Sequence, residues 1–337
     1  MLLLLAQSNL PPALQNDYIQ SLILGIVEGL TEFLPVSSTA HLRIAEMLMK
    51  MPLETGYWKM YTVVIQLGAI LALPVYFMPR ILKLASTFPK GERGDRTWIN
   101  HPLSLVMIAF VITAGPAFLL QKQIGENLDN FYVIGSALLI GGIVMWIIDA
   151  KFGWSRSKQR GFDAVTATIA DQGKLSAPST MTMGTNSYHQ TNNMEEMTLV
   201  QACWIGACQI LSAVFPGTSR SMSTIAAGQV TGMSRPAALE FSFFLSIPTM
   251  AVATLWELKK AIIPSADVTD AFSPAQMLPH DWVILAIGFV VSFIVALAVV
   301  AWFMAWVRQR GFAWFAAYRI VLGVAVLWWT FSAAAAH

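Results

Sequence analysis

The sequence has few charged residues and few cysteines. Only 12% of its 337 residues are Asp, Glu, Lys or Arg, against roughly 25% in soluble domains, and the net charge of +2 argues against a nucleic-acid surface. Cys203 and Cys208 lie in an apolar segment without metal-ligand spacing, so we expect buried apolar residues rather than a disulfide framework or a zinc site. Hydrophobic residues make up 56% of the chain, which is typical of a polytopic membrane protein.

Apolar segments long enough to cross a bilayer, at about 20 residues each, predict six transmembrane helices. Two shorter apolar segments, 19–34 and 199–215, each stop at a proline, and a hydroxyl-rich turn and a second short apolar run (42–49 and 222–230) follow. We expect both to be helical hairpins that enter the membrane and return, with turns buried in protein or lining a polar cavity. The six predicted spans cover residues 59–78, 102–120, 131–150, 237–258, 282–306 and 312–335.

The two short segments form an internal repeat. At one constant offset, Gln20, Gly25, Leu30, Pro35 and Ser38 match Gln201, Gly206, Leu211, Pro216 and Ser219. Each half would contain one re-entrant hairpin and three spans, and because three is odd the second half must be inverted, as in many transporters. We therefore predict an all-α polytopic fold with a single membrane domain over 1–337, divided into a first repeat (1–154), a flexible cytoplasmic loop (155–198) and a second, inverted repeat (199–337).

Basic residues concentrate in alternate connections between the predicted spans. The segments 79–101, 151–198 and 308–310 carry most of them, and such loops are typically cytoplasmic. The first hairpin would then enter from the outer face and the second from the cytoplasm, so that their tips meet within the bilayer.

The first hairpin, VEGLTEFLPVSSTAH, carries two carboxylates where charge is costly. Glu28 and Glu32 are four residues apart, so on a helix they share one face and can hold one cation or share one proton. An intramembrane pair is a functional candidate by default, although a helix end solvated near the surface is the alternative. After Pro35, Ser37 and Ser38 suit helix capping, and His41 adds a group for acid–base or nucleophilic chemistry.

The second hairpin, FPGTSRSMSTIAAG, has the features of an anion site. Hydroxyls and an arginine lie at the start of a predicted helix, where free N–H groups, the helix dipole and a guanidinium suit a phosphate. Arg220 could instead pair with one of the two glutamates. Together the tips predict a phosphoryl-transfer site inside the membrane for a substrate with a lipid tail. The residues expected to contact its phosphates are Ser37, Thr218, Ser219, Arg220, Ser221 and Thr224.

These two motifs resemble those of the undecaprenyl-diphosphate phosphatases, the bacitracin-resistance family, and GMSRPAALEFSFFLSIP at 232–248 supports the match. The resemblance implies hydrolysis of undecaprenyl diphosphate to the monophosphate, which recycles the carrier lipid for peptidoglycan synthesis and raises bacitracin tolerance. It also implies the inverted-repeat fold, an inner-membrane location and a site open to the outer face. The residues that it implies for the reaction are Glu28, Glu32, Ser38, His41, Ser219, Arg220, Ser221 and Thr224, whereas Ala40 and Met222 stand where the family usually has glycine.

Several alternatives remain open from the sequence. A transporter or flippase for polyprenyl phosphate would use the anion site but not the hydroxyls, histidine and carboxylates. A type-2 phosphatidic-acid phosphatase would need a second histidine after its Ser-Arg, and none occurs between Arg220 and His280. The attacking group could be Ser38, His41 or a water. Glu28 and Glu32 suit Mg²⁺ or Ca²⁺, but a shared proton would look the same. The expected partners are the polyprenyl diphosphate and the bilayer, and a homodimer is compatible with the sequence.

Overall fold

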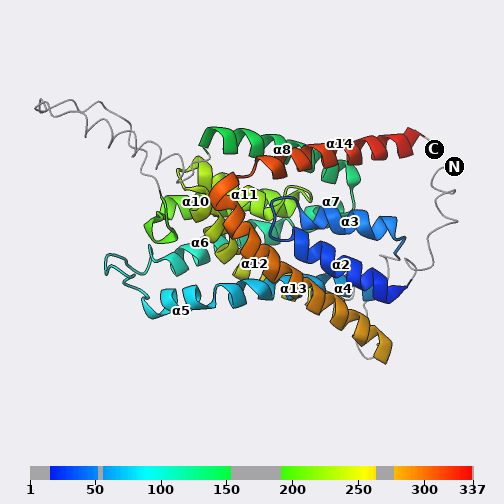
Figure 1. Ribbon diagram of the computed structural model, residues 1–337, viewed down its shortest axis with the longest axis horizontal. Helices are drawn as coiled ribbons and strands as arrows, with labels where there is room; N and C mark the ends of the chain where they lie inside the picture. The colour runs from blue at the N-terminus through cyan, green and yellow to red at the C-terminus, as the bar shows by residue number, and fades with distance from the viewer. Residues whose placement is uncertain (1–15, 52–55, 153–190, 263–276, 336–337) are drawn as a thin grey trace, which may run out of the picture.

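The computed structural model describes residues 16–51, 56–152, 191–262 and 277–335. These residues form twelve α-helices and no β-strand, which confirms the predicted all-α class (Figure 1). Most of the predicted loop at 155–198 lies outside the described residues. Five helices are long and apolar enough to cross a membrane: α6 (Pro102–Leu119), α8 (Phe131–Phe152), α12 (Arg235–Ile262), α13 (Pro279–Arg310) and α14 (Ala313–Ala335).

The remaining predicted span, 59–78, is bent. Helix α4 (Gly56–Tyr76) is followed after one residue by α5 (Met78–Ser86), and the two axes differ by 61°. Pro79 lies in the first turn of α5, where a proline is tolerated because the N–H that it lacks would have no helical partner. The connection predicted at 79–101 thus begins with a helix, and α7 (Gln121–Leu128) lies in the connection between the spans predicted at 102–120 and 131–150.

Two pairs of short helices occupy the predicted hairpin segments. Helix α2 (Asp17–Thr31) is followed by α3 (Ser38–Leu48), and α10 (Leu199–Val214) by α11 (Arg220–Val230). Ser37 caps α3 and Ser219 caps α11, and each accepts a hydrogen bond from the backbone N–H three residues later. Both capping serines have positive φ, 76° and 69°, which is rare for residues other than glycine. The two turns are therefore alike in local conformation.

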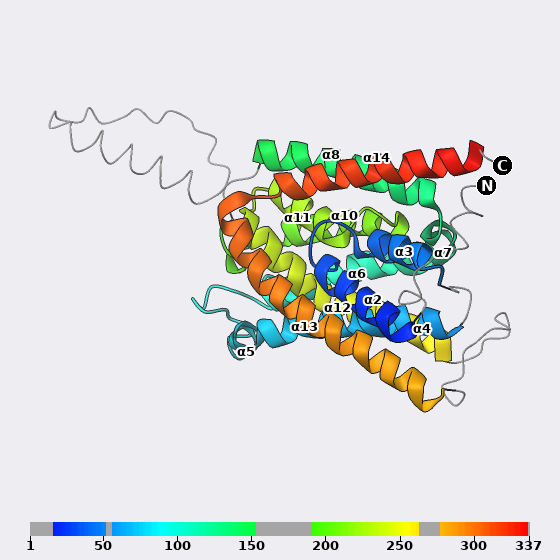
Figure 2. The ribbon, with the colours of Figure 1, turned by 45° about the vertical axis from the view of Figure 1, so that its right-hand side comes forward.

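Glycines let each hairpin approach a long helix closely. A Cβ atom on Gly25 would lie 2.8 Å from the carbonyl oxygen of Gly288 in α13, and one on Gly206 would lie 2.6 Å from that of Ala109 in α6. Such distances exclude any larger residue without movement of the backbone. The pairs α2–α13 and α10–α6 thus pack backbone against backbone, and this packing fixes where the hairpin tips lie (Figure 2).

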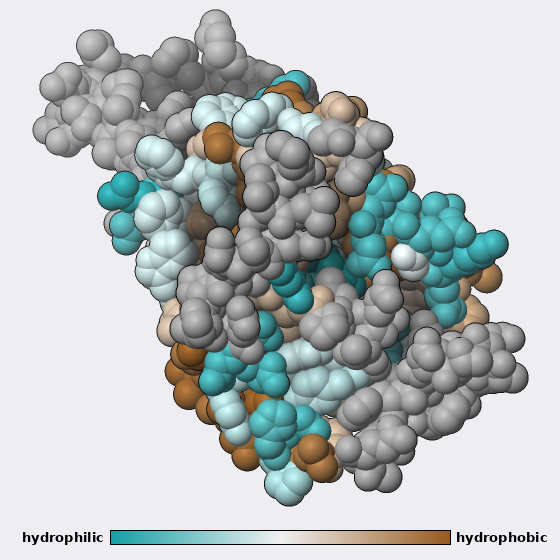
Figure 3. Space-filling view, turned by 90° about the vertical axis from the view of Figure 1, so that its right-hand side faces the viewer, coloured by the Kyte–Doolittle hydropathy of each residue, from teal (hydrophilic) through white to brown (hydrophobic). Residues whose placement is uncertain are grey.

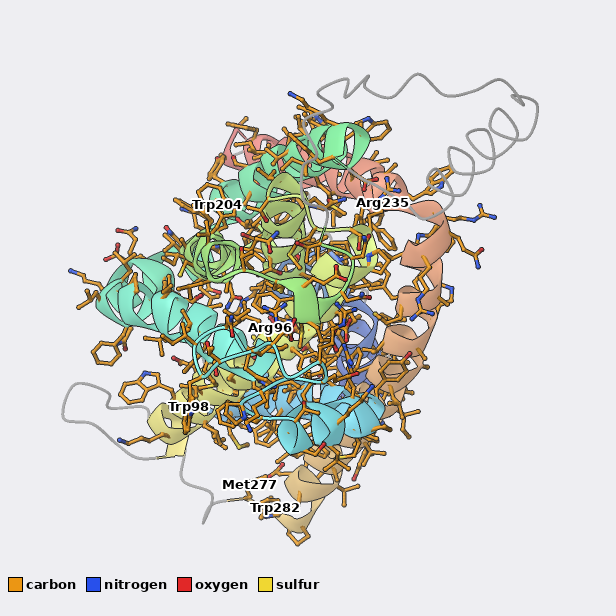
Figure 4. The ribbon with its side chains drawn as sticks, turned by 90° about the vertical axis from the view of Figure 1, so that its left-hand side faces the viewer. Arg96, Trp98, Trp204, Arg235, Met277 and Trp282 are labelled. Atoms are coloured by element: carbon orange, nitrogen blue, oxygen red, sulfur yellow. The ribbon has the colours of Figure 1, made fainter. Side chains whose placement is uncertain are left out.

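The basic connections gather at one end of the bundle. Helix α5, the end of α8 and the junction between α13 and α14 all lie there, and Figure 4 views this end, with Arg96 and Arg235 labelled. Asp149 near the end of α8 accepts hydrogen bonds from Arg235 Nε at 2.7 Å, from Gln229 at 3.1 Å and from the Phe312 backbone at 3.0 Å. This buried carboxylate ties α8, α11, α12 and the start of α14 together.

Candidate active site

The turns of the two hairpins meet through Glu32, which directly follows α2. Its Oε1 accepts a hydrogen bond from Arg220 Nη2 at 3.0 Å, and its Oε2 accepts one from the Ser38 hydroxyl at 2.5 Å. The side chains of Glu32 and Arg220 are 4% and 11% exposed, so this ion pair is largely shielded from water. Residues far apart in the chain therefore form one buried cluster, and the alternative of a solvated helix end does not describe Glu32.

This cluster contains polar atoms that the protein leaves unsatisfied. Both carboxylate oxygens of Glu28, the Nε and Nη1 of Arg220 and the hydroxyl of Ser221 are buried and have no hydrogen-bond partner among the described residues. Native proteins satisfy most buried polar groups because leaving one unpaired costs about 1–3 kcal/mol, and more for a charge. Unpaired donors suit a bound anion, and the unpaired carboxylate oxygens beside them suit a cation or a proton.

The hydroxyls at the two tips do not all face this cluster. Ser37 and Ser219 are occupied as helix caps. For Ser37 this confirms the capping role that the sequence indicated for a hydroxyl of the first tip. Thr224, expected to contact diphosphate, instead donates to the Arg220 carbonyl at 2.9 Å and lies 2.6 Å from the Ser242 hydroxyl. Thr218 is half-buried on the second turn. Ser38 and Ser221 are thus the hydroxyls best placed beside the charged groups.

His41 lies one turn into α3, but its ring does not contact Ser38. Its Nδ1 lies 2.7 Å from the Ser37 carbonyl oxygen, and its Nε2 lies 2.6 Å from the Tyr318 hydroxyl of α14. Both ring nitrogens are therefore engaged, and the carboxylate of Glu32 occupies the position of a base next to Ser38.

Arg319 is a further residue at the tips, and it was not among the site residues predicted from the sequence. Its side chain is fully buried in α14 and donates to the carbonyls of Pro35 at 3.2 Å, Ala137 at 3.1 Å and Gly217 at 2.9 Å. It has no carboxylate partner among the described residues. An arginine inside a predicted span is itself a signal of function, so the sequence contained the means to find it.

A cavity of about 270 Å³ lies at the end of the bundle where the basic connections gather, and none of its lining residues belongs to the cluster around Glu32. It lies between α5, the connection that contains Arg96 (labelled in Figure 4) and the start of α6. Its lining carries acidic and basic side chains in equal number, and several pair with one another, as Arg80 does with Glu195 at 2.5 Å and with Glu92 at 3.5 Å. The charges of the lining therefore balance, whereas a phosphate site needs an excess of positive charge.

The bundle and the cluster together define a polytopic membrane protein with a buried centre of carboxylates, arginines and hydroxyls suited to phosphate chemistry. The chain belongs to the family described as Bacitracin resistance protein BacA, whose model matches residues 21–325. This result confirms the family indicated by the two motifs.

Three relatives are each named undecaprenyl-diphosphatase. The protein of Koribacter versatilis is 55% identical over 314 residues, which cover 93% of this chain and 98% of the relative. The protein of Caldanaerobacter subterraneus is 37% identical over 310 residues, with 92% and 94% covered. That of Ralstonia pickettii is 37% identical over 312 residues, again with 92% and 94% covered.

Proposed function

We propose that this protein hydrolyses undecaprenyl diphosphate to undecaprenyl phosphate and inorganic phosphate, and that the reaction takes place where the two hairpin tips meet. The observation that carries the proposal is the set of buried, unpaired groups on Arg220, Ser221 and Glu28 beside the hydrogen-bonded pair of Ser38 and Glu32. Family membership supports the same activity. The activity recycles the lipid carrier for cell-wall synthesis and accounts for bacitracin resistance.

Ser38 is the attacking group in this proposal. Its hydroxyl already donates to Glu32 at 2.5 Å, so the carboxylate can take the proton as the oxygen attacks the terminal phosphorus. The bond from that phosphorus to the bridging oxygen breaks, and undecaprenyl phosphate leaves. Water then cleaves the phosphoserine to release inorganic phosphate and the free hydroxyl. A transporter of polyprenyl phosphate would have no need for this hydroxyl and carboxylate pair.

Arg220 and the start of α11 hold the diphosphate. The unpaired Nε and Nη1 of Arg220 can donate two hydrogen bonds to phosphate oxygens, and the first-turn N–H groups of α11 add the positive end of a helix dipole. These donors offset the negative charge that builds up on the phosphate oxygens during transfer.

A divalent cation fits the carboxylates at this site. Glu28 has buried carboxylate oxygens without hydrogen-bond partners among the described residues, and Glu32 follows one helical turn later as the C-cap of α2. Oxygen ligands are those that Mg²⁺ and Ca²⁺ prefer. Among the described residues no group of three or more His, Cys, Asp or Glu could hold a metal, so the substrate's own oxygens would complete the ligand set. When bound, the ion would offset negative charge on the diphosphate.

The site opens to the outer face in this proposal, within an inverted repeat of two re-entrant hairpins. The equivalent packing of α2 on α13 and of α10 on α6 supports the repeat. The grouping of the basic connections at the end opposite the start of α2 supports the orientation. Figure 3 views the end where α2 begins, and hydrophilic side chains gather on it.

The test is phosphate release by the purified protein in detergent from a C15 or C55 prenyl diphosphate, with and without a chelator. We expect one inorganic phosphate per prenyl monophosphate formed, and a loss of about 10²-fold or more in kcat for Ser38→Ala, the usual range for removing a positioned catalytic group. Ser86→Ala, at the end of α5 and far from the tips, should match wild type. Binding of the prenyl diphosphate without any hydrolysis would refute the proposed activity, and full activity of Ser38→Ala would refute the attacking group.

A further inference from the structure

Tyr318 and His41 form a chain of hydrogen bonds that ends on the turn carrying Ser38. The Nδ1 of His41 lies 2.7 Å from the Ser37 carbonyl oxygen, and a carbonyl can only accept, so Nδ1 carries a proton. In the neutral ring Nε2 is then an acceptor, and the Tyr318 hydroxyl at 2.6 Å is its donor. The two rings are also nearly parallel, with an interplanar angle of 14°.

The carbonyl at the end of this chain belongs to a strained residue. Ser37 has φ 76° and ψ 95°, which lies outside the regions that non-glycine residues favour and costs about 1–3 kcal/mol. Its carbonyl and the N–H of Ser38 form one peptide group, so the hydrogen bond from His41 fixes the plane from which the Ser38 side chain projects. That side chain must meet Glu32 at 2.5 Å, a contact that a rotation of this peptide would break.

We propose that Tyr318 is a positioning residue which, through the tautomer and orientation of His41, holds the Ser37 turn so that Ser38 faces Glu32. His41 is then a support for the nucleophile rather than its base. The proposal rests on the proposed phosphatase function and adds to it a residue from α14, which is 277 positions from His41 in the chain.

This chain of hydrogen bonds makes the reaction depend on both halves of the molecule. Tyr318 is itself 46% exposed, so its hydroxyl is not needed to fill the core. Arg319, the next residue, binds the carbonyls of Pro35 and Gly217. Helix α14 thus supports the first turn at two points, the Pro35 carbonyl and, through His41, the Ser37 carbonyl.

The first experiment compares Tyr318→Phe with Tyr132→Phe in the phosphate-release assay. Both variants lose only a hydroxyl, and Tyr132 lies on α8 with its ring against Phe331. We expect kcat of Tyr318→Phe to fall about tenfold, the effect of one hydrogen bond of about 1–1.5 kcal/mol, with KM and the thermal unfolding midpoint close to wild type. Tyr132→Phe should match wild type in all three. An unchanged kcat in Tyr318→Phe would overturn the proposal.

The second experiment separates support from acid–base chemistry at His41. The amide N–H of an asparagine can take the place of Nδ1–H on the Ser37 carbonyl, but an amide does not transfer protons as imidazole does. We expect His41→Asn to be at least about tenfold more active than His41→Ala, the value of one retained hydrogen bond. Tyr318→Phe should have no further effect in the His41→Asn background. Equal activity of the His41→Asn and His41→Ala variants would contradict the proposed hydrogen-bond chain. The same loss from Tyr318→Phe in wild type and in the His41→Asn background would contradict it too.

A measurement without substrate keeps this proposal distinct from the phosphatase function. In the NMR spectrum of protein labelled with ¹⁵N-histidine, the signals of His41 are identified as those that disappear in the His41→Asn variant. Wild type should show the Nδ1-protonated tautomer with a hydrogen-bonded Nε2, and Tyr318→Phe should shift the Nε2 signal because its donor is lost. Failure of wild type to release phosphate would count against the proposed function alone, whereas the same Nε2 signal in both proteins would count against the role of Tyr318 alone.

Discussion

Arg220→Lys should abolish most activity although the positive charge stays at the tip of α11. The guanidinium of Arg220 gives one N–H to Glu32 at 3.0 Å and leaves Nε and Nη1 unpaired among the described residues. A lysine ammonium can keep the ion pair with Glu32, but it is a point charge without the planar fork that binds two phosphate oxygens at once. The variant therefore tests the two free donors and not the charge.

The magnitude follows from the number of bonds lost. Hydrogen bonds to charged groups contribute about 1.5–3 kcal/mol each, so two of them correspond to about 3–6 kcal/mol of transition-state stabilisation. Since about 1.4 kcal/mol is a tenfold change in rate, we expect kcat/KM to fall by about 10²–10⁴-fold.

The assay is phosphate release from a C15 prenyl diphosphate in detergent, with thermal unfolding to show that the variant is folded. Arg43→Lys is the matched control, because Arg43 pairs with Glu46 of α3 at 3.0 Å and with Asp129, which directly follows α7, at 3.1 Å. We expect this control to stay within about threefold of wild type, because lysine keeps the charge that pairs with Glu46 and Asp129 and neither carboxylate belongs to the site. If Arg220→Lys stays within the same range, the assignment of its free donors to the diphosphate is refuted.

Three further predictions address the base, the second turn and the orientation. Glu32→Gln should lower kcat about 10²–10⁴-fold, as for loss of a general base, without loss of folded protein; wild-type turnover would make this carboxylate structural. Gly217→Ala should lower the thermal unfolding midpoint and the activity, because φ is +99° and the new Cβ would lie 2.5 Å from the Ile134 carbonyl oxygen. Gly125→Ala, with nothing within 4 Å, should leave both unchanged or raise the midpoint slightly, and equal behaviour of the two would contradict the strain. In a cysteine-free background and intact cells, a membrane-impermeant thiol reagent should label Glu126→Cys and not Asp95→Cys, and the reverse pattern would invert the proposed topology.

Local properties of the chain were enough to predict most of the helices. The long helices follow from apolar length, since about 20 apolar residues can satisfy the backbone within a bilayer only as a helix. The short helices α2, α3, α10 and α11 follow from the same apolar pattern, and α2 and α10 end at Thr31 and Val214, shortly before Pro35 and Pro216, which a helix cannot readily continue through. The bend between α4 and α5 was missed, because a window of apolar residues does not register the break that precedes Pro79.

The sequence also determined which residue types could carry chemistry. Carboxylates, hydroxyls and an arginine in otherwise apolar segments are costly to insert, so Glu28, Glu32, Ser38 and Arg220 were identifiable without any structure. The sequence could not pair them, because pairing depends on packing between segments distant in the chain. The hydrogen bond from Arg220 to Glu32 joins residues 188 positions apart, and it forms because glycine-mediated contacts on α13 and α6 place the two turns together.

Only the tertiary structure shows which residues of the cluster contact one another. Proximity in sequence placed His41 beside Ser38, yet on α3 the ring turns to the Ser37 carbonyl and to Tyr318, while Glu32 receives the Ser38 hydroxyl. Tyr318 and Arg319 lie in the predicted span 312–335, and they reach the tips because α14 packs along α8 beside both turns. Hydrogen bonds of about 3 Å require atoms to be placed to within a few tenths of an ångström, and that placement is a property of the packed helices rather than of any one segment.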